Sequence, residues 1–145
     1  MNVLLTFIWV SLAMIAHSFW EAYIEGRDGW AKNSIGFKIK ITERLSLTGY
    51  HFFLFFIELP MLFALPLIVN GWNLKVFGLL VSAFFFGIVL EDFFWFIVNP
   101  LVKLKEFNPE FVNWYPWLKL GKLKIPVFYI IGLLISFLSW YFIWR

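Results

Sequence analysis

The chain has 145 residues, of which 62% are hydrophobic and 23% aromatic. Soluble domains contain about half apolar residues, and a soluble domain of this size could not bury so much apolar surface. The absence of cysteine excludes disulfides and thiolate metal sites. The net charge of +3 is explained by the basic loops of a membrane protein, so we expect no nucleic-acid partner.

A helix needs about 20 apolar residues to cross a bilayer core. The segments that reach this length are 3–24, 49–69, 74–98 and 126–144. The first has no basic segment before it and no small-residue cleavage site after it, so we interpret it as a spanning helix and not as a cleaved signal. The sequence therefore predicts an all-α membrane protein, a single transmembrane domain over 1–145 with four helices in an antiparallel bundle.

Basic residues are distributed unequally between the two sides of the predicted membrane. The long loops, about 25–48 and 99–125, contain every Lys and Arg except Lys75 and Arg145. Because short loops rich in Lys and Arg stay in the cytoplasm, we expect both long loops to be cytoplasmic and both termini to face outward. The expected location is the inner (plasma) membrane, crossed several times.

The long loops also contain local patterns. Residues 35–42 alternate strictly between apolar and polar types, which indicates either a strand or an extended segment at the membrane interface. Pro109 favours the start of a short helix that reaches Trp114 or Tyr115. Residues 118–124 are typical of a basic stretch that contacts anionic lipid head groups.

Ionisable side chains occur inside the predicted spans, where each costs about 2.5–3.5 kcal/mol on insertion scales and is a functional candidate by default. These side chains are His17, Glu21, His51, Glu58, Glu91 and Asp92, and the polar residues Glu25, Tyr50 and Asn99 accompany them. With a rise of 1.5 Å per residue, all of them lie within about 14 Å of the boundary with the basic loops. Three helices therefore place their ionisable groups in the same half of the membrane.

Helical spacing predicts how some of these groups face. His17, Glu21 and Glu25 are four residues apart and share one face of the first span. Gly87 would permit a neighbouring helix to approach the third span closely. Pro60 cannot donate a hydrogen bond to the carbonyl group of Phe56, so we expect an irregularity in the second span near Glu58.

Three hypotheses account for the cluster. The leading one is a membrane-embedded enzyme that acts on a lipid or isoprenoid, with Glu91, Asp92 and Glu58 as catalytic candidates. Carboxylates and imidazoles without cysteine suit iron, manganese or zinc, and the expected ligands are His17, Glu21, His51, Glu58 and Glu91. The alternatives are a small transporter or proton-coupled carrier that uses the same acids and a structural or interaction subunit. Membrane lipids are expected partners, and a homo-oligomer stays open.

Two stretches resemble known families. Residues 25–31 and 91–100 resemble signatures of a group of small prokaryotic integral membrane proteins to which no activity is attached. Residues 87–96 are similar to the acidic motif of heterodimeric and fungal-type lycopene cyclases, although Val89 stands where that family has proline. This second resemblance implies isoprenoid chemistry, in which a desolvated carboxylic acid donates a proton and aromatic faces stabilise cations.

Overall fold

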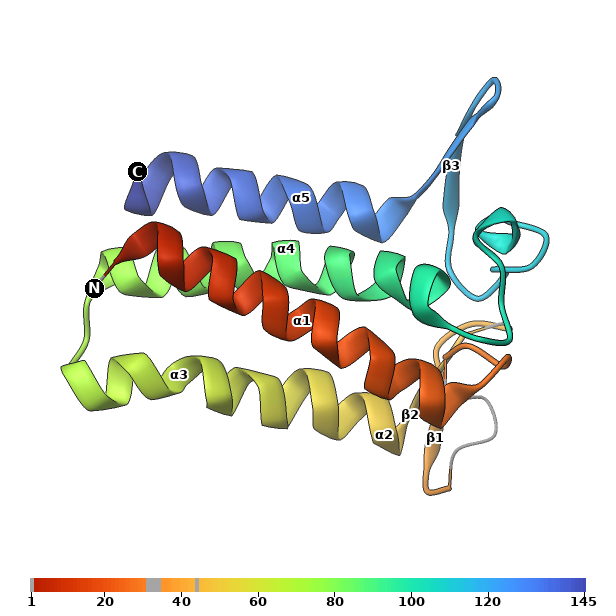
Figure 1. Cartoon of the computed structure of the whole chain (residues 1–145), viewed down its shortest axis with the longest axis horizontal. Helices are drawn as coiled ribbons and strands as arrows, with labels where there is room; N and C mark the ends of the chain where they lie inside the picture. Colours follow the sequence, from red (N-terminus) through yellow and green to blue (C-terminus); the bar gives the residue numbers. More distant parts are fainter. Residues whose placement is uncertain (1, 31–34, 44) are drawn as a thin grey trace.

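The computed structural model describes residues 2–30, 35–43 and 45–145. It confirms the all-α expectation, with four helices that are long and apolar enough to cross a membrane (Figure 1). The first and third are single α-helices, and the second and fourth each contain a π-helical segment. Their elements are α1 (Val3–Glu25), then α2 (Gly49–Phe52) with η1 (Phe53–Glu58) and α3 (Leu59–Asn70), then α4 (Leu74–Val98), and finally α5 (Val127–Ser139) with η3 (Trp140–Trp144).

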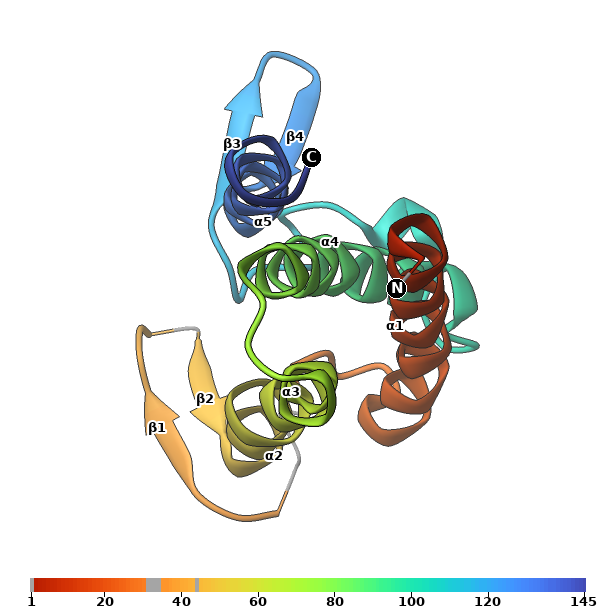
Figure 2. The same cartoon turned by 90° about the vertical axis from the view of Figure 1, so that its left-hand side faces the viewer.

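The four helices run side by side, with both chain termini at one end of the bundle and the long loops at the other (Figure 1). Seen along the bundle, α4 lies between α1 and α5, and α3 stands on a further side (Figure 2). The turn before α4 ends at Asn73, whose side chain accepts a hydrogen bond from the backbone N–H of Val76. This N-cap satisfies one of the free donors of the first turn and starts the return helix.

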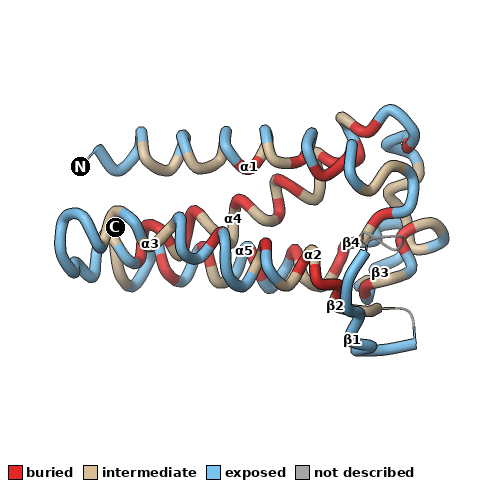
Figure 3. Tube along the Cα trace, turned by 90° about the horizontal axis from the view of Figure 1, so that it is seen from below, coloured by how far each residue is buried: buried red, intermediate tan, exposed pale blue. Residues whose placement is uncertain are grey.

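Small residues allow α4 to pack closely against its neighbours. A Cβ atom placed on Gly87 would lie 2.6 Å from Cγ of Met14 in α1, and one placed on Gly78 would lie 2.5 Å from Cγ2 of Ile143. Such contacts are typical of helix packing in membranes, where small residues let backbones approach. Buried positions accordingly follow the length of α4, whereas the first half of α1 is mostly exposed (Figure 3). The close approach expected at Gly87 is confirmed.

Hydroxyl groups add polar contacts between α4 and α5. Oγ of Ser82 donates to the backbone carbonyl of Ser136 over 2.9 Å, and Oγ of Ser139 donates to the carbonyl of Gly78 over 2.8 Å. Interhelical hydrogen bonds of this kind contribute about 0.6 kcal/mol each in membranes. They fix the rotation of α5 relative to α4.

The irregularity expected in the second span is present as the π-helix η1. Pro60 has no N–H for the carbonyl group of Phe56, and the N–H of Leu59 bonds to the carbonyl of Leu54, five residues earlier. A π-helical turn widens the helix, and such turns are frequent at functional sites.

Each long loop contains a two-stranded antiparallel hairpin. In the first, β1 (Lys38–Lys40) pairs with β2 (Ser46–Thr48). In the second, β3 (Trp117–Leu120) pairs with β4 (Leu123–Pro126). Of the two alternatives for residues 35–42, the structure has the strand, over β1. The basic stretch 118–124 is folded back on itself at Gly121, where φ is 61°. Glycine adopts this backbone conformation without steric cost.

The short helix expected from Pro109 to Trp114 or Tyr115 is wrong. The described chain has a 3₁₀ turn at Leu104–Glu106 and a tight turn after it. Oδ1 of Asn108 accepts hydrogen bonds from the N–H groups of Glu110 and Phe111. These two bonds are those of a helix N-cap, and the N–H of Val112 bonds to the carbonyl of Asn108, but this single turn does not continue as a helix.

An ion pair ties this loop to the end of α1. A guanidinium nitrogen of Arg27 lies 2.5 Å from Oε1 of Glu106, and another donates to the carbonyl of Leu101. The backbone N–H of Lys103, and then Arg27, hold the pKa of Glu106 below its ordinary value. The carboxylate therefore stays ionised at neutral pH.

We expect Gly87→Leu to lower the free energy of unfolding by about 1–3 kcal/mol, because the added side chain overpacks the contact with Met14. Denaturation in detergent micelles measures the change. The matched control is Ala16→Leu, on an exposed part of α1. Equal stability of the two variants would contradict the close packing of α1 against α4.

Candidate functional site

Three ionisable side chains from α1 and α2 meet at the loop end of the bundle. Nε2 of His51 lies 3.5 Å from Oε1 of Glu25 and 3.8 Å from Oε1 of Glu21. The three side chains are only 2–7% exposed, and one ligand atom from each lies within 4.8 Å of the others. Glu21 and Glu25 reach the same point because they are four residues apart on one helical face.

The imidazole of His51 is held from two other directions. Its Nδ1 lies 2.8 Å from Oγ1 of Thr48, which also caps α2 by accepting the backbone N–H of His51. The ring of Trp30 stacks on the imidazole with a centroid distance of 4.1 Å. These contacts leave Nε2 directed at the carboxylates of Glu21 and Glu25.

Trp30 adopts an unusual backbone conformation to make this contact. Its φ is 65°, the left-handed region, which costs a residue other than glycine about 1–2 kcal/mol. The indole Nε1 donates to the carbonyl of Ser46 over 2.7 Å, so the side chain links β2 to the imidazole. Strained backbone of this kind clusters at functional sites.

Helix α4 adds two adjacent carboxylates with different environments. Glu91 is 2% exposed and lies within interaction range of Glu21. Its Oε1 has no hydrogen-bond partner among the described residues. Oδ2 of Asp92 instead accepts hydrogen bonds from the hydroxyl groups of Tyr129, over 2.6 Å, and Tyr115, over 3.3 Å.

Tyr115 reaches Asp92 from the second long loop. Burial, and then the neighbouring carboxylate of Asp92, raise the pKa of the Tyr115 phenol above its ordinary value. The phenol therefore stays protonated and donates a hydrogen bond to the carboxylate of Asp92. Asp92 is oriented by two donors, whereas Glu91 has an oxygen available for a ligand.

These polar groups line one side of a cavity of about 410 Å³ at the loop end of the bundle. The remainder of its wall is mostly apolar, and three parts of the chain contribute to it besides the residues of α4 and the second long loop. Hairpin β1–β2 and its turn supply Ile41, Leu45 and Leu47, η1 supplies Phe56, and α5 supplies Phe128. A volume of this size is within the range of small-molecule sites, which are largely apolar with few polar groups.

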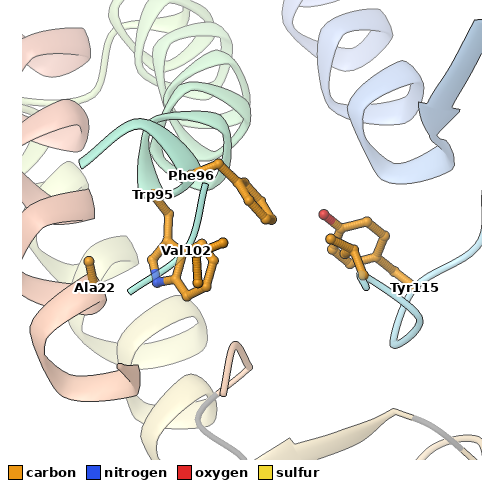
Figure 4. Close-up of a cluster of buried hydrophobic side chains, with 6 residues drawn as sticks. Ala22, Trp95, Phe96, Val102 and Tyr115 are labelled. Atoms are coloured by element: carbon orange, nitrogen blue, oxygen red, sulfur yellow. The ribbon is translucent and has the colours of Figure 1, made fainter. Parts of the chain in front are cut away.

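Aromatic side chains form the part of the wall next to the acids. Trp95 and Phe96 follow Glu91 and Asp92 in α4, and Tyr115 faces them from the loop (Figure 4). They pack with Ala22 and Val102 into a cluster of buried side chains. This cluster closes the loop end of the bundle around the acidic groups.

Several residues expected at a shared centre lie elsewhere. Glu58 is exposed and lines a separate pocket with Trp20 and Tyr50, so it is not placed beside Glu91. His17 interacts with the charges of Glu21 and Glu58 and does not belong to the group around His51. Neither residue therefore belongs to the group of Glu21, Glu25 and His51 that could hold a metal ion among the described residues.

The two accompanying polar residues have local roles. Asn99 caps the end of α4: its Nδ2 donates to the carbonyl of Gly26, and its Oδ1 accepts from the N–H of Leu101. The ring of Tyr50 packs edge-on against His51 with a centroid distance of 5.0 Å. Its hydroxyl has no hydrogen-bond partner in the part of the chain that the structure describes.

Four contributors were not identified from the sequence: Thr48, Trp30, Tyr115 and Tyr129. Thr48 carried a usable signal, since a threonine three residues before a histidine at a helix start fits an N-cap. Tyr129 lies in a span without acids, and its partner could be known only from the rotation of α5. Tyr115 and Trp30 lie in loops whose folding the sequence pattern did not reveal.

The group of Glu21, Glu25 and His51 could hold a metal ion. Ligands about 2.1 Å from a tetrahedral ion lie about 3.4 Å apart, and the separations from Nε2 to the two carboxylates are 3.5 and 3.8 Å. Oε1 of Glu21 is buried and has no hydrogen-bond partner among the described residues. The donor set and the unpartnered oxygen therefore fit a divalent cation.

Comparison with known proteins does not extend this picture: no protein-family model, no curated protein and no solved structure matches the chain.

We expect Tyr129→Phe to lower the free energy of unfolding by about 1–3 kcal/mol, because a buried carboxylate loses a hydrogen-bond donor. Tyr115→Phe should have the smaller effect, since its hydroxyl lies 3.3 Å and not 2.6 Å from Asp92. Tyr23→Phe on the exposed face of α1 is the control for the loss of a hydroxyl. Denaturation in detergent micelles measures these changes. If Tyr129→Phe lowered the free energy of unfolding no more than Tyr23→Phe does, the anchoring of Asp92 by Tyr129 would be contradicted.

Proposed function

We propose that the chain is a membrane-embedded, metal-dependent enzyme that acts on a lipid or isoprenoid in the cavity beside Glu91. Glu21, Glu25 and His51 would hold the metal ion, and Glu91 would act as the acid or base. The positive-inside bias of the loops favours a site in the cytoplasmic half of the membrane. The single observation that carries the proposal is the spacing of Nε2 of His51 from two buried carboxylates.

The contacts around His51 support the metal part of the proposal. A ligating imidazole donates its other N–H to a nearby acceptor in most metal sites, and Oγ1 of Thr48 lies in that position. Two carboxylates would balance the charge of a divalent ion, and a carboxylate and imidazole set suits iron, manganese or zinc. Such an ion would polarise a substrate oxygen or activate a bound water.

The residues of α4 support a division of roles between two acids. Oε1 of Glu91 has no hydrogen-bond partner among the described residues, and Glu91 lines the cavity. A general acid or base must reach the proton it moves, and Glu91 meets that condition. Asp92 would act as a positioning residue, because both tyrosine hydroxyls hold its carboxylate.

The cavity wall supports a lipid or isoprenoid as the substrate class. Its walls are mostly apolar, and Phe55 and Phe56 of η1 bring the cavity to a helix that faces lipid. Aromatic faces such as that of Trp95 stabilise developing positive charge. A hydrocarbon chain with a small polar group matches this combination better than a water-soluble metabolite does.

A proton-coupled carrier is less well supported. A relay across the membrane needs ionisable groups along the path. The sequence has no Asp, Glu or His at positions 3–16, 59–90 and 127–144. The acids lie in one half of the bundle, which suits a site better than a pathway.

Metal analysis tests the proposed binding of a metal ion by Glu21, Glu25 and His51. Protein purified in detergent and supplied with Mn²⁺ or Zn²⁺ should retain about one ion per chain, as expected for three ligands and an open position. Glu21→Gln, Glu25→Gln and His51→Gln should lose it. Glu58→Gln is the matched control, because its carboxylate lies in another pocket. No retained metal in the unaltered protein, or an equal loss in Glu58→Gln, would refute the metal site.

The variant Thr48→Val removes the hydrogen bond to Nδ1 of His51 and leaves all three proposed metal ligands in place. Loss of such an outer contact lowers metal affinity about 10–100-fold, and competition with a fluorescent chelator measures it. Thr48→Ser keeps the oxygen and should restore the affinity. Equal affinities of the Val and Ser variants would show that Thr48 has no part in binding.

Lipid analysis tests the proposed enzymatic activity on a lipid or isoprenoid. Total membrane lipid incubated with the metal-loaded protein should show species that are consumed by the unaltered chain and by Glu58→Gln but not by Glu91→Gln. Mass spectrometry of the extract detects the change. If metal is bound but no lipid species changes, the enzyme proposal fails while the metal site stands.

A further inference from the structure

The second hairpin separates apolar and basic side chains onto opposite faces. In β3–β4, Leu118 pairs with Ile125 and Leu120 pairs with Leu123, while Lys119 pairs with Lys124. Because paired residues lie on the same face of a sheet and neighbours alternate, the two apolar pairs share one face and the lysine pair lies on the other. Leu120 and Leu123 are 59% and 55% exposed, so the described chain leaves the apolar face open at the tip of the hairpin.

The first hairpin shows the same separation. Ile39 pairs with Leu47, and Lys38 pairs with Thr48 and Lys40 with Ser46. Ile39 is 54% exposed, whereas Leu47 lines the cavity. The apolar face of this hairpin is therefore continuous with the bundle, and its two lysines lie on the opposite face.

Both hairpins extend sideways from the same end of the bundle. They project across the direction of the helices (Figure 1) and lie on opposite flanks, β1–β2 beside α2 and β3–β4 beside α5 (Figure 2). If the helices cross a bilayer, two ribbons at this angle lie in the plane of its surface. An amphipathic segment in that plane places its apolar face against the acyl boundary.

Contacts of the second hairpin show which way its faces point. Nε1 of Trp117, on the lysine face, donates to the carbonyl of Val112, and Nζ of Lys124 lies 3.0 Å from a carboxylate oxygen of Glu110. Both partners belong to the loop that lies beyond the hairpin, away from the helices (Figure 1). The leucine face consequently looks back toward the side of the helices, where the bilayer would be.

We propose that the two hairpins lie flat on one leaflet, with their apolar faces inserted at the acyl boundary and with Lys119 and Lys122 of the second hairpin bound to anionic lipid head groups. Lysines near a membrane surface attract anionic lipids, and Lys119 and Lys122 are exposed at the end of the second hairpin. Placed on both sides of the bundle, the hairpins hold the mouth of the cavity at head-group depth.

Site-directed spin labelling tests this directly, because the chain has no cysteine to remove. The full chain carries one label at Leu120→Cys or at the adjacent Lys119→Cys, in vesicles of phosphatidylcholine with phosphatidylglycerol. For each label, the measured quantity is the ratio of its collision rate with oxygen to its collision rate with a water-soluble nickel complex. This ratio should be several-fold higher for the label at Leu120→Cys than for the label at Lys119→Cys. Ile39→Cys and Lys38→Cys form the corresponding pair in the first hairpin.

Lipid composition separates the two parts of the proposal. In vesicles of phosphatidylcholine alone, the difference between Leu120→Cys and Lys119→Cys should shrink, because the exposed lysines of the second hairpin lose their anionic partners. A difference that is unchanged would overturn the head-group contact. Equal exposure of both labels to the nickel complex would overturn membrane contact altogether. Labels shielded from both reagents would assign the apolar face to a protein partner, which also overturns the proposal.

Discussion

The burial of several carboxylates and one imidazole at one end of an apolar bundle is the constraint on which the rest of the structure depends. An ionised group without compensation is costly in such a place. Glu21, Glu25, Glu91 and His51 line one cavity, so three carboxyl groups that repel one another when ionised share the same end of the bundle. A bound cation would relieve this repulsion.

The neighbouring elements are arranged around that group. Thr48 and Trp30 hold the imidazole of His51 from the loop side, and Tyr129 brings α5 into contact with Asp92. Gly87 lets α1 approach α4 one turn before Glu91, which places the acids of both helices within reach of one another. The long loops fold over the same end and contribute the wall of the cavity.

The spans were predictable from sequence to within one residue at each end, because length and apolar composition alone determine whether a helix can cross a bilayer. The grouping of acids near the basic loops was also predictable from the rise per residue. The shared face of Glu21 and Glu25 followed from their spacing. All of these are local properties of the chain.

Helix rotation and loop pairing were not predictable. Glu58 was expected beside Glu91 but lines another pocket, because uniformly apolar helices give no periodic signal for the way a span faces. The strand pattern of residues 35–42 was visible, but its partner β2 was not. Asn108 caps the turn expected at Pro109, but that turn does not extend into a helix, which the pattern at its start does not reveal.

The most direct measurement is X-ray diffraction from crystals grown with Mn²⁺, with data collected to reveal its anomalous scattering. The account predicts one anomalous peak per chain, bonded to Nε2 of His51 and to carboxylate oxygens of Glu21 and Glu25, with Oε1 of Glu91 facing the cavity. A peak beside His17 and Glu58, or a site without metal in which His51 bonds a carboxylate directly, would contradict it.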